Sequence, residues 1–262
     1  MNTEQIAVVS RRIRQEIIGM AYRSGGPHVG SALSCADILA TLYFGRMQLD
    51  EWDSRDIFIL SKAHASMALY ATLAARGILP PWLLEQYCCE NGLPGHLDMQ
   101  TGHGVECSAG SLGHGFNIGL GMAYGFKAKG SGRRVYALVG DGESQEGSVW
   151  EGAMFAPSMG LDNFTAIMDC NNLQGYGRAT EICSFEPVAE KWRAFGWHVC
   201  EVDGHDHAAI LAALDEATGG KPKMIIARTI KGKGVSYMED QLIWHYYIVT
   251  SQHRDAALKE LA

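Results

Sequence analysis

Short apolar runs alternate along this chain with longer segments whose apolar residues recur at helical spacing. The short runs are Asp56–Leu60, Val135–Val139, Thr165–Met168, Trp197–Val202 and Lys223–Ile230. Such runs, bounded by turn residues, are typical of buried strands. Strands that alternate with helices predict a parallel sheet. We therefore expect an α/β fold, a doubly wound parallel sheet with helices on both faces.

Helical periodicity covers most of the chain between these runs. The predicted helices are Glu4–Tyr22, Ser34–Phe44, His64–Arg76, Pro81–Cys89, Leu112–Lys129, Ser148–Met159, Pro187–Phe195 and Ala208–Ala217. Ser34 is a candidate N-cap. Glycines inside Leu112–Lys129 indicate that another backbone or a ligand packs closely on that helix. No linker or repeat divides the chain, so residues 1–262 are expected to form a single domain.

Composition narrows the class of protein. The length of 262 residues is enough for one α/β domain with a full core. The formal net charge of −7 argues against a nucleic-acid-binding surface. Its seven cysteines lack metal-type C-x-x-C spacing, so we expect reduced thiols in a cytoplasmic protein. No apolar run reaches the roughly 18 residues of a membrane span, and Met1–Arg14 has no signal-peptide core.

Two polar residues follow neighbouring predicted strands. Asp141, flanked by glycines, follows one strand, and Asn171 follows the next. A βαβ unit needs about 30 or more residues, so both residues are expected at one edge of the sheet, where ligands bind. With the carbonyl of Leu173 they form an oxygen set suited to Mg²⁺ or a similar hard cation that bridges to phosphate. A Gly-Asp-Gly alone is more often a turn, but the paired pattern favours a diphosphate anchor.

Four of the ten histidines stand at turns that precede predicted helices or follow glycine and tryptophan. These are His28, His64, His96 and His245. Histidines in such turns can contact phosphate or sugar hydroxyls and move protons near neutral pH. The others lack this context: His198, His205, His207 and His253 are interpreted as surface or strand positions, and His103 is unassigned.

Together these motifs resemble the amino-terminal, diphosphate-binding half of proteins of the transketolase family. The matching runs cover almost the whole chain in the family's order. They are His28-Val-Gly-Ser-Ala-Leu-Ser, Ile59-Leu-Ser-Lys-Ala-His64-Ala, Leu93-Pro-Gly-His96, Gly110-Ser-Leu-Gly-His-Gly115, Gly140-Asp-Gly-Glu-Ser-Gln-Glu-Gly147, Asp169-Cys-Asn-Asn-Leu-Gln174, Lys231-Gly-Lys-Gly-Val-Ser and Trp244-His245. Two positions depart from the family: Pro27 precedes His28 where the family has Gly-His-Pro-Gly, and His114 replaces a usual glutamine.

The resemblance implies thiamine diphosphate as cofactor, held through Mg²⁺ or Ca²⁺. The implied metal ligands are Asp141, Asn171 and the Leu173 carbonyl. The implied cofactor-binding residues are His64, Gly142, Asn171 and His245 at the diphosphate, and Gly110, Ser111 and Leu112 at the aminopyrimidine. The implied catalytic residues are His28, His96 and His245, which would face the sugar, and Glu146, which would lie at a subunit contact.

The implied function is that of the amino-terminal subunit of a two-component transketolase, which moves a two-carbon ketol unit from a ketose to an aldehyde. The expected partner is a subunit with the pyrimidine-binding domain, in an α2β2 assembly containing a dimer of this chain. Substrates would be sugars or sugar phosphates. Two alternatives stay open: another thiamine-diphosphate C2-transfer or 1-deoxyxylulose-phosphate-synthase-like component, and a non-catalytic subunit of the same fold.

Overall fold

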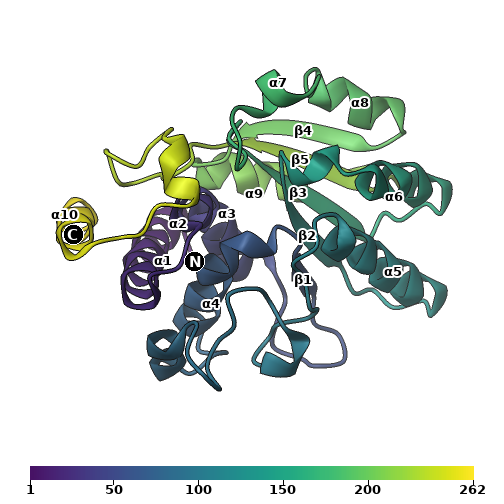
Figure 1. Ribbon diagram of the computed structural model, residues 1–262. Helices are drawn as coiled ribbons and strands as arrows, with labels where there is room; N and C mark the ends of the chain where they lie inside the picture. The colour runs from purple at the N-terminus through teal and green to yellow at the C-terminus, as the bar shows by residue number, and fades with distance from the viewer.

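A five-stranded sheet forms the centre of the molecule, for which a computed structural model describes residues 1–262 (Figure 1). The strands are β1 (Ile57–Leu60), β2 (Val135–Gly140), β3 (Phe164–Cys170), β4 (His198–Asp203) and β5 (Lys223–Arg228). Their order is β1-β2-β3-β5-β4, and every neighbouring pair is parallel. The predicted strands and the predicted parallel sheet are therefore confirmed.

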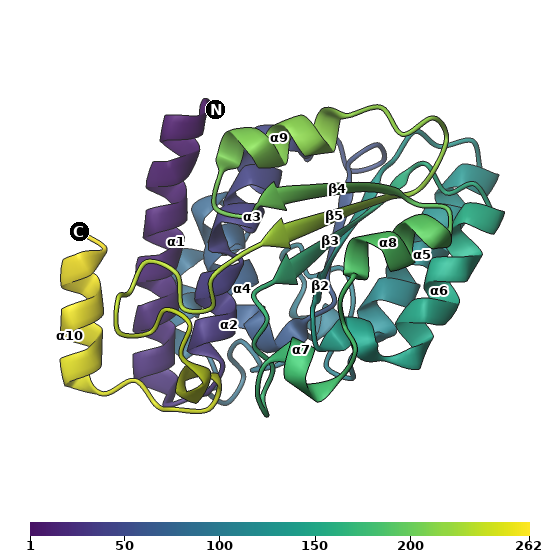
Figure 2. The ribbon, with the colours of Figure 1, turned by 90° about the horizontal axis from the view of Figure 1, so that it is seen from above.

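Helices cover both faces of this sheet, as the view from above shows (Figure 2). One layer holds α1 (Thr3–Ser24), α2 (Val29–Ser34), α3 (Ala36–Thr41), α4 (Ser66–Ala75) and α9 (His207–Asp215). The opposite layer holds α5 (His114–Ala128), α6 (Gly147–Ser158) and α8 (Val188–Ala194). Outside these layers lie α7 (Ala179–Ile182), which follows the loop after β3, and α10 (Ser251–Glu260), which packs on α1. The α/β fold class is confirmed.

Burial differs between the strands, including the two edge strands β1 and β4. Every residue of β1 is buried, and β5 is buried up to its last residue, because helices cover both faces of the sheet. The edge strand β4 instead mixes buried, half-buried and exposed residues. Together the two helical layers and the sheet enclose one hydrophobic cluster of 74 buried residues. None of the helices has the length and apolar character needed to cross a membrane.

The start and end of α1 show why the chain turns where the sequence predicts. Asn2 and Gln5 form a capping box at its first turn, which satisfies two of the free backbone N–H groups there. Gly25 ends the helix in the left-handed region, with φ 61°, a conformation that glycine adopts without steric cost. The turn that follows carries the chain to His28.

The region after His28 differs from the sequence-based prediction. A helix was expected over Ser34–Phe44 with Ser34 as its N-cap, but Ser34 is the last residue of α2. Its hydroxyl is buried and donates to Asp169 Oδ1 at 2.7 Å, so it serves the sheet edge instead of a helix start. The predicted segment is split into α3 and a π-helical turn, Leu42–Arg46.

Four further elements were predicted wrongly or missed. The expected helix Pro81–Cys89 is a short 3₁₀ helix that ends at Gln86. The helix expected from His64 begins as a 3₁₀ turn, Ala63–Ala65, that leads into α4. Helices α7 and α10 were not predicted; α10 buries only Ala257, so it has no apolar stripe from which periodicity could reveal it.

Candidate active site

Asp141 lies directly after β2, at the carboxyl edge of the sheet. The residue is 3% exposed, and its Oδ1 accepts a hydrogen bond from the Gly142 N–H at 2.8 Å. Its Oδ2 is also buried but has no hydrogen-bond partner. Burial, followed by the nearby Asp169 carboxylate, raises the pKa of Asp141 to about 6. A buried carboxylate oxygen without a partner is a position that a cation would satisfy.

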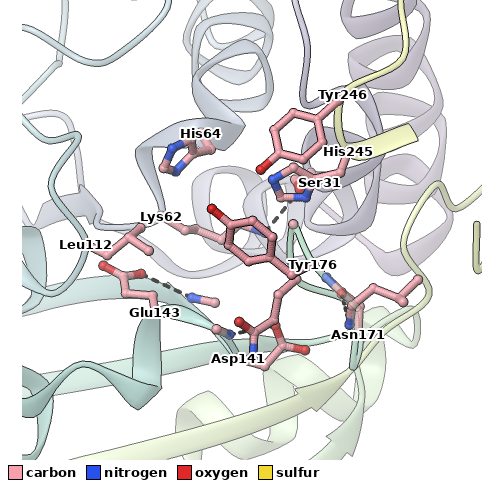
Figure 3. A pocket seen from close by; sticks show the side chains of 15 residues that line it. Ser31, Lys62, His64, Leu112, Asp141, Glu143, Asn171, Tyr176, His245 and Tyr246 are labelled. Atoms are coloured by element: carbon pink, nitrogen blue, oxygen red, sulfur yellow. Dashed lines mark hydrogen bonds between the residues drawn. The ribbon is translucent and has the colours of Figure 1, made fainter. Parts of the chain in front are cut away.

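Asn171 lies after β3, beside Asp141 (Figure 3). Its Oδ1 accepts from the Leu173 N–H at 3.0 Å, and its Nδ2 donates to Ser34 Oγ at 3.1 Å. These bonds fix the amide with its oxygen at the turn. The Leu173 carbonyl accepts from Lys231 Nζ at 3.0 Å and keeps a second lone pair. The three expected ligand groups are therefore assembled at one strand edge.

Two lysines lie beneath this edge. Lys62 forms a buried ion pair with Asp169 and donates to the Ser31 carbonyl at 3.2 Å. Burial opposes ionisation of Asp169, but the Lys62 ammonium outweighs it and lowers the pKa of that carboxyl. Burial, followed by Lys62, lowers the pKa of Lys231 to about 8. Because Asp169 neutralises Lys62 and Lys231 donates to the Leu173 carbonyl, the two lysines hold the strand edge together and add little net positive charge.

The four histidines singled out in the sequence form a continuous row. The ring centroid of His28 lies 4.7 Å from that of His64 and 4.8 Å from that of His245, and His64 lies 5.0 Å from His96. His28 has a left-handed backbone, with φ 75°, and its N–H donates to the His245 carbonyl at 2.8 Å. Segments more than 200 residues apart in the chain are thus joined at one wall.

Protonation of this wall is suppressed. Burial, followed by the neighbouring imidazoles, lowers the pKa of His28 to about 4, and burial, followed by Lys231, lowers that of His245 to about 3. Burial also lowers the pKa of His64. His245 Nδ1 lies 2.7 Å from Lys231 Nζ, which donates, so the assigned tautomer of His245 carries its proton on Nε2. Each neutral imidazole therefore offers one lone pair and one N–H to a bound molecule at neutral pH.

These groups surround a cavity of about 250 Å³, shown in Figure 3. The predicted site residues that line it are His64, Leu112, Asp141, Gly142, Asn171, Leu173 and His245. His28, His96 and Gly110 are not part of this lining. His28 and His96 belong to the histidine row, and a Cβ on Gly110 would lie 3.3 Å from the His96 ring. Ser111 and Glu146 are exposed outside the cavity lining.

A second buried carboxylate holds the glycine turn against the sheet. Glu143 accepts from the Gly113 N–H at 2.9 Å and from the Gly140 N–H at 3.2 Å, and Ser61 Oγ donates to it as well. Burial raises its pKa. Glu143 therefore fixes the turn that carries Leu112 into the cavity, a role that the sequence-based prediction did not assign.

Other lining residues were also missed. Lys62 lines the cavity, and Lys231 donates to the Leu173 carbonyl without lining it. Lysines are mostly exposed in proteins, so residue type alone could not predict the burial of either. Tyr176 and Tyr246 face the cavity opening (Figure 3). Neither tyrosine belongs to a regular element with a pattern to place it. Only their closeness in sequence to the quoted motifs could have indicated that these tyrosines lie near the site.

The histidines excluded from the site lie elsewhere, but two of them are not surface residues as expected. His207 is buried, and its Nδ1 lies 2.8 Å from Thr41 Oγ1. His205 Nδ1 lies 2.7 Å from Asp37 Oδ2, and its Nε2 accepts from the Ile230 N–H at 2.8 Å. Asp37 also pairs with Arg14. The physical reason is a buried polar network between α1, α3 and α9, which the local sequence does not show.

Comparison with known proteins agrees with the resemblance found in the sequence motifs. Residues 4–246 match the family profile described as "Transketolase, thiamine diphosphate binding domain". The chain is 42% identical over 262 residues to the 6-deoxy-6-sulfo-D-fructose transketolase subunit SqwG of Clostridium sp. (strain MSTE9), covering 97% of this chain and 94% of that protein. It is 36% identical to an apulose-4-phosphate transketolase subunit of Phocaeicola vulgatus, covering 100% and 95%.

Solved structures extend the likeness to the fold. The transketolase from Campylobacter jejuni superimposes with a TM-score of 0.90 at 28% sequence identity. The superposition covers 100% of this chain but only 43% of the Campylobacter chain. The similarity to separate subunits thus extends over full lengths, whereas the similarity to this larger transketolase extends over less than half of it.

Proposed function

Because this chain belongs to the transketolase family, as one subunit of a two-component transferase that acts with a partner, we propose that it holds thiamine diphosphate through a divalent metal. With its partner it transfers a two-carbon ketol unit from a ketose to an aldehyde. The observation that carries this proposal is the unpartnered, buried Oδ2 of Asp141 in one cavity with the neutral histidine wall.

The residues fit the cofactor. Asp141 Oδ2, Asn171 Oδ1 and the Leu173 carbonyl supply oxygen donors for Mg²⁺ or Ca²⁺, whose remaining positions suit phosphate oxygens. The Gly142 backbone, His64, Asn171 and His245 would hold the diphosphate. The turn Gly110-Ser111-Leu112 would support the aminopyrimidine, with Leu112 already inside the cavity. The site therefore combines a metal anchor with a contact for each end of the cofactor.

When bound, thiamine diphosphate supplies the carbanion-stabilising group that carbon–carbon bond cleavage needs. The chain's own side chains position the sugar and move its protons. His28 Nδ1 is buried without a hydrogen-bond partner and is neutral at pH 7, so it can accept a proton from a donor hydroxyl. His96 extends the same wall. His245, with its proton on Nε2, donates a hydrogen bond to substrate oxygen and is kept in that tautomer by Lys231.

The non-catalytic alternative fits these observations poorly. Two buried polar atoms without a hydrogen-bond partner, Asp141 Oδ2 and His28 Nδ1, stabilise nothing in the free chain. A subunit without chemistry would gain stability by replacing these groups with hydrogen-bonded or apolar side chains. A catalytic role explains why the costly groups are present together.

The partner subunit is proposed to close the cavity and to complete an α2β2 assembly. The exposed face of α5 and α6 carries Tyr124, Met154 and Phe155. Apart from the helix's own backbone and the adjacent residues, no atom lies within 4 Å of a Cβ on Gly121 or Gly125, so another chain could approach this face closely. Glu146 is exposed at the start of α6, next to this face. A two-fold arrangement is the commonest assembly of such proteins.

The relatives' names suggest a donor with an anionic end, a sulfonate or a phosphate. Among the lining residues the only lysine or arginine is Lys62, which pairs with Asp169. The anionic end is therefore proposed to contact the partner subunit. All seven cysteines are free thiols, which supports a reducing compartment, the cytoplasm, as the place of action.

The test is to co-express the chain with a pyrimidine-domain protein encoded by a neighbouring gene and to purify the complex. Ketose donors, including 6-deoxy-6-sulfo-D-fructose and phosphorylated ketoses, are screened with thiamine diphosphate and Mg²⁺ for release of the aldose shortened by two carbons. Turnover that requires both subunits is expected. Steady turnover by this chain alone, at about 1 s⁻¹ or above, would refute the two-component proposal.

A further inference from the structure

A second cluster of metal-ligating side chains lies far from the cavity, on the edge strand. His198 and Cys200 stand two residues apart on β4, so their side chains share one face of the strand. Glu216 caps the carboxyl end of α9, which packs on that strand (Figure 1). The imidazole nitrogen, thiol sulfur and carboxylate oxygen all lie within 4.8 Å of one another. The two elements therefore bring three different donor types together.

The donors already converge on the carboxylate. His198 Nε2 lies 3.0 Å from Glu216 Oε1, and the Cys200 thiol donates to Glu216 Oε2 at 3.3 Å. His198 Nε2 is shielded from solvent and has no hydrogen bond of acceptable geometry. Donor separations near 3–4 Å are those expected around an ion with bonds of about 2.0–2.3 Å to nitrogen, oxygen and sulfur. The nitrogen thus lies beside the other two donor groups without a hydrogen bond that satisfies it.

From this arrangement we infer that His198, Cys200 and Glu216 form a zinc site. Imidazole, thiolate and carboxylate together suit Zn²⁺ and do not suit Mg²⁺, which takes oxygen ligands. Binding releases the thiol proton to solvent as the sulfur–zinc bond forms, and the thiolate and carboxylate together neutralise the ion. Water completes four-coordination on the exposed side. The site opens onto a surface depression that Cys200, Ala212, Ala213 and Glu216 line.

The nearest ammonium group does not occupy these donors. Lys223 Nζ donates to the carbonyl oxygens of Ala213, Leu214 and Glu216 at 2.5, 2.8 and 2.8 Å, so its three protons satisfy the end of α9. The side chain of Glu216 remains available. His198 is the first residue of β4, whereas Asp141 follows the last residue of β2, so zinc would bind toward the opposite end of the sheet. Its role is to fasten the edge strand to α9, not to take part in transfer.

Cobalt provides the test, because a thiolate ligand gives Co²⁺ a charge-transfer absorption band. The reduced, purified chain is titrated with Co²⁺ in excess Mg²⁺, and Zn²⁺ is then added to displace it. The band is expected in the wild type and in Cys183→Ser, which removes an exposed thiol elsewhere, and is expected to be absent in Cys200→Ser. No band in the wild type, or an equal band in Cys200→Ser, would overturn the assignment.

A second variant tests the site without the risk that the substitution itself disrupts the fold. Glu216 has a side chain that is 55% exposed, so Glu216→Gln leaves the core unchanged. Loss of a residue that only hydrogen-bonds to a metal ligand typically lowers metal affinity 10–100-fold. Loss of a direct ligand should therefore weaken Zn²⁺ binding by at least about 10-fold, as measured in a competition assay with a chromogenic chelator. Equal affinity in Glu216→Gln and the wild type would exclude Glu216 and with it the site as proposed.

Discussion

The floor and the mouth of the cavity are built on opposite principles. The floor, Lys62, Asp141, Glu143 and Asn171, is buried, and every one of these side chains makes hydrogen bonds or ion pairs within the chain. The mouth is formed by Tyr176 and Tyr246, which are 88% and 55% exposed. A fixed floor suits the cofactor, a group that is the same in every turnover, whereas an open mouth leaves room for substrates and a second subunit.

The floor keeps a single polar atom without a partner, Asp141 Oδ2, within a saturated network. Burial makes this unpartnered oxygen costly and at the same time strengthens its attraction for a cation. The mouth carries no such cost, because its side chains are solvated. Substitutions should therefore have effects that decrease from the floor, through the histidine wall, to the mouth.

The largest effect is expected on the floor. Asp141→Ala removes a proposed metal ligand and should weaken Mg²⁺-dependent thiamine diphosphate binding by at least about 100-fold, beyond the 10–100-fold cost of losing an outer partner. Isothermal titration with Mg²⁺ and with a chelator measures the change. Asp162→Ala, which alters a half-exposed carboxylate paired with Lys127, is the matched control. Equal affinity in Asp141→Ala and Asp162→Ala would contradict the assignment of the floor.

The next effect is expected at the histidine wall. His245→Ala should lower the turnover of the assembled complex by about 10²-fold or more, as loss of a proton-transfer group does, while the fold is retained. His205→Ala should instead lower thermal stability, because His205 bonds Asp37 and the Ile230 N–H, and should leave turnover per folded molecule unchanged. Equal losses of turnover would show that the wall is not the reaction site.

A smaller effect concerns pH. The pKa of His28 is about 4 in the folded chain, below the ordinary value of about 6.5, so the unfolded chain binds the proton first as pH falls. The stability that the neutral imidazole contributes is present above pH 6.5 and is lost progressively between about 6.5 and 4. After allowance for solvent screening, this loss should be about 1 kcal/mol.

Urea unfolding across this pH range measures the loss. His28→Asn should show a shallower pH dependence than the wild type, since asparagine does not titrate and tolerates the left-handed backbone of this position. Parallel curves for the two proteins would show that His28 is not buried in the free chain as described.

The difference between floor and mouth also explains what the sequence could predict. Asp141 and Asn171 follow apolar strands, and parallel strands bring their carboxyl ends to one edge, so their meeting follows from local pattern alone. The Lys62–Asp169 pair could not be predicted this way, because it joins the ends of β1 and β3 with β2 between them. Burial of a charge depends on the partner found after folding.

The fold was predictable for a similar reason. Strands and amphipathic helices carry their own periodicity, whereas α10 is polar almost throughout and Ser34 owes its position to a hydrogen bond with a residue 135 positions away. Tyr176 lies in a loop, and Tyr246 follows a single 3₁₀ turn. Neither has a repeating pattern, so only the three-dimensional arrangement places them at the mouth.

The smallest effect is expected at the mouth itself. A Cβ on Gly175 would come within 2.5 Å of the Tyr246 hydroxyl, but this contact involves the far end of a half-exposed side chain that can rotate away. Gly175→Ala should therefore change the free energy of unfolding by no more than about 0.5 kcal/mol. Removing the tyrosine removes the contact, so the effect of Gly175→Ala should be smaller still in a Tyr246→Ala background.

A double-mutant cycle on these two positions, followed by thermal unfolding and by thiamine diphosphate affinity, separates their contact from other effects. A non-zero interaction energy of a few tenths of a kcal/mol, with cofactor affinity unchanged in all four proteins, is the result expected for an adaptable mouth above a fixed floor. A loss of cofactor affinity in Gly175→Ala comparable to that in Asp141→Ala would mean that the mouth is as rigid as the floor, because the clash would then have been transmitted to the proposed metal ligands.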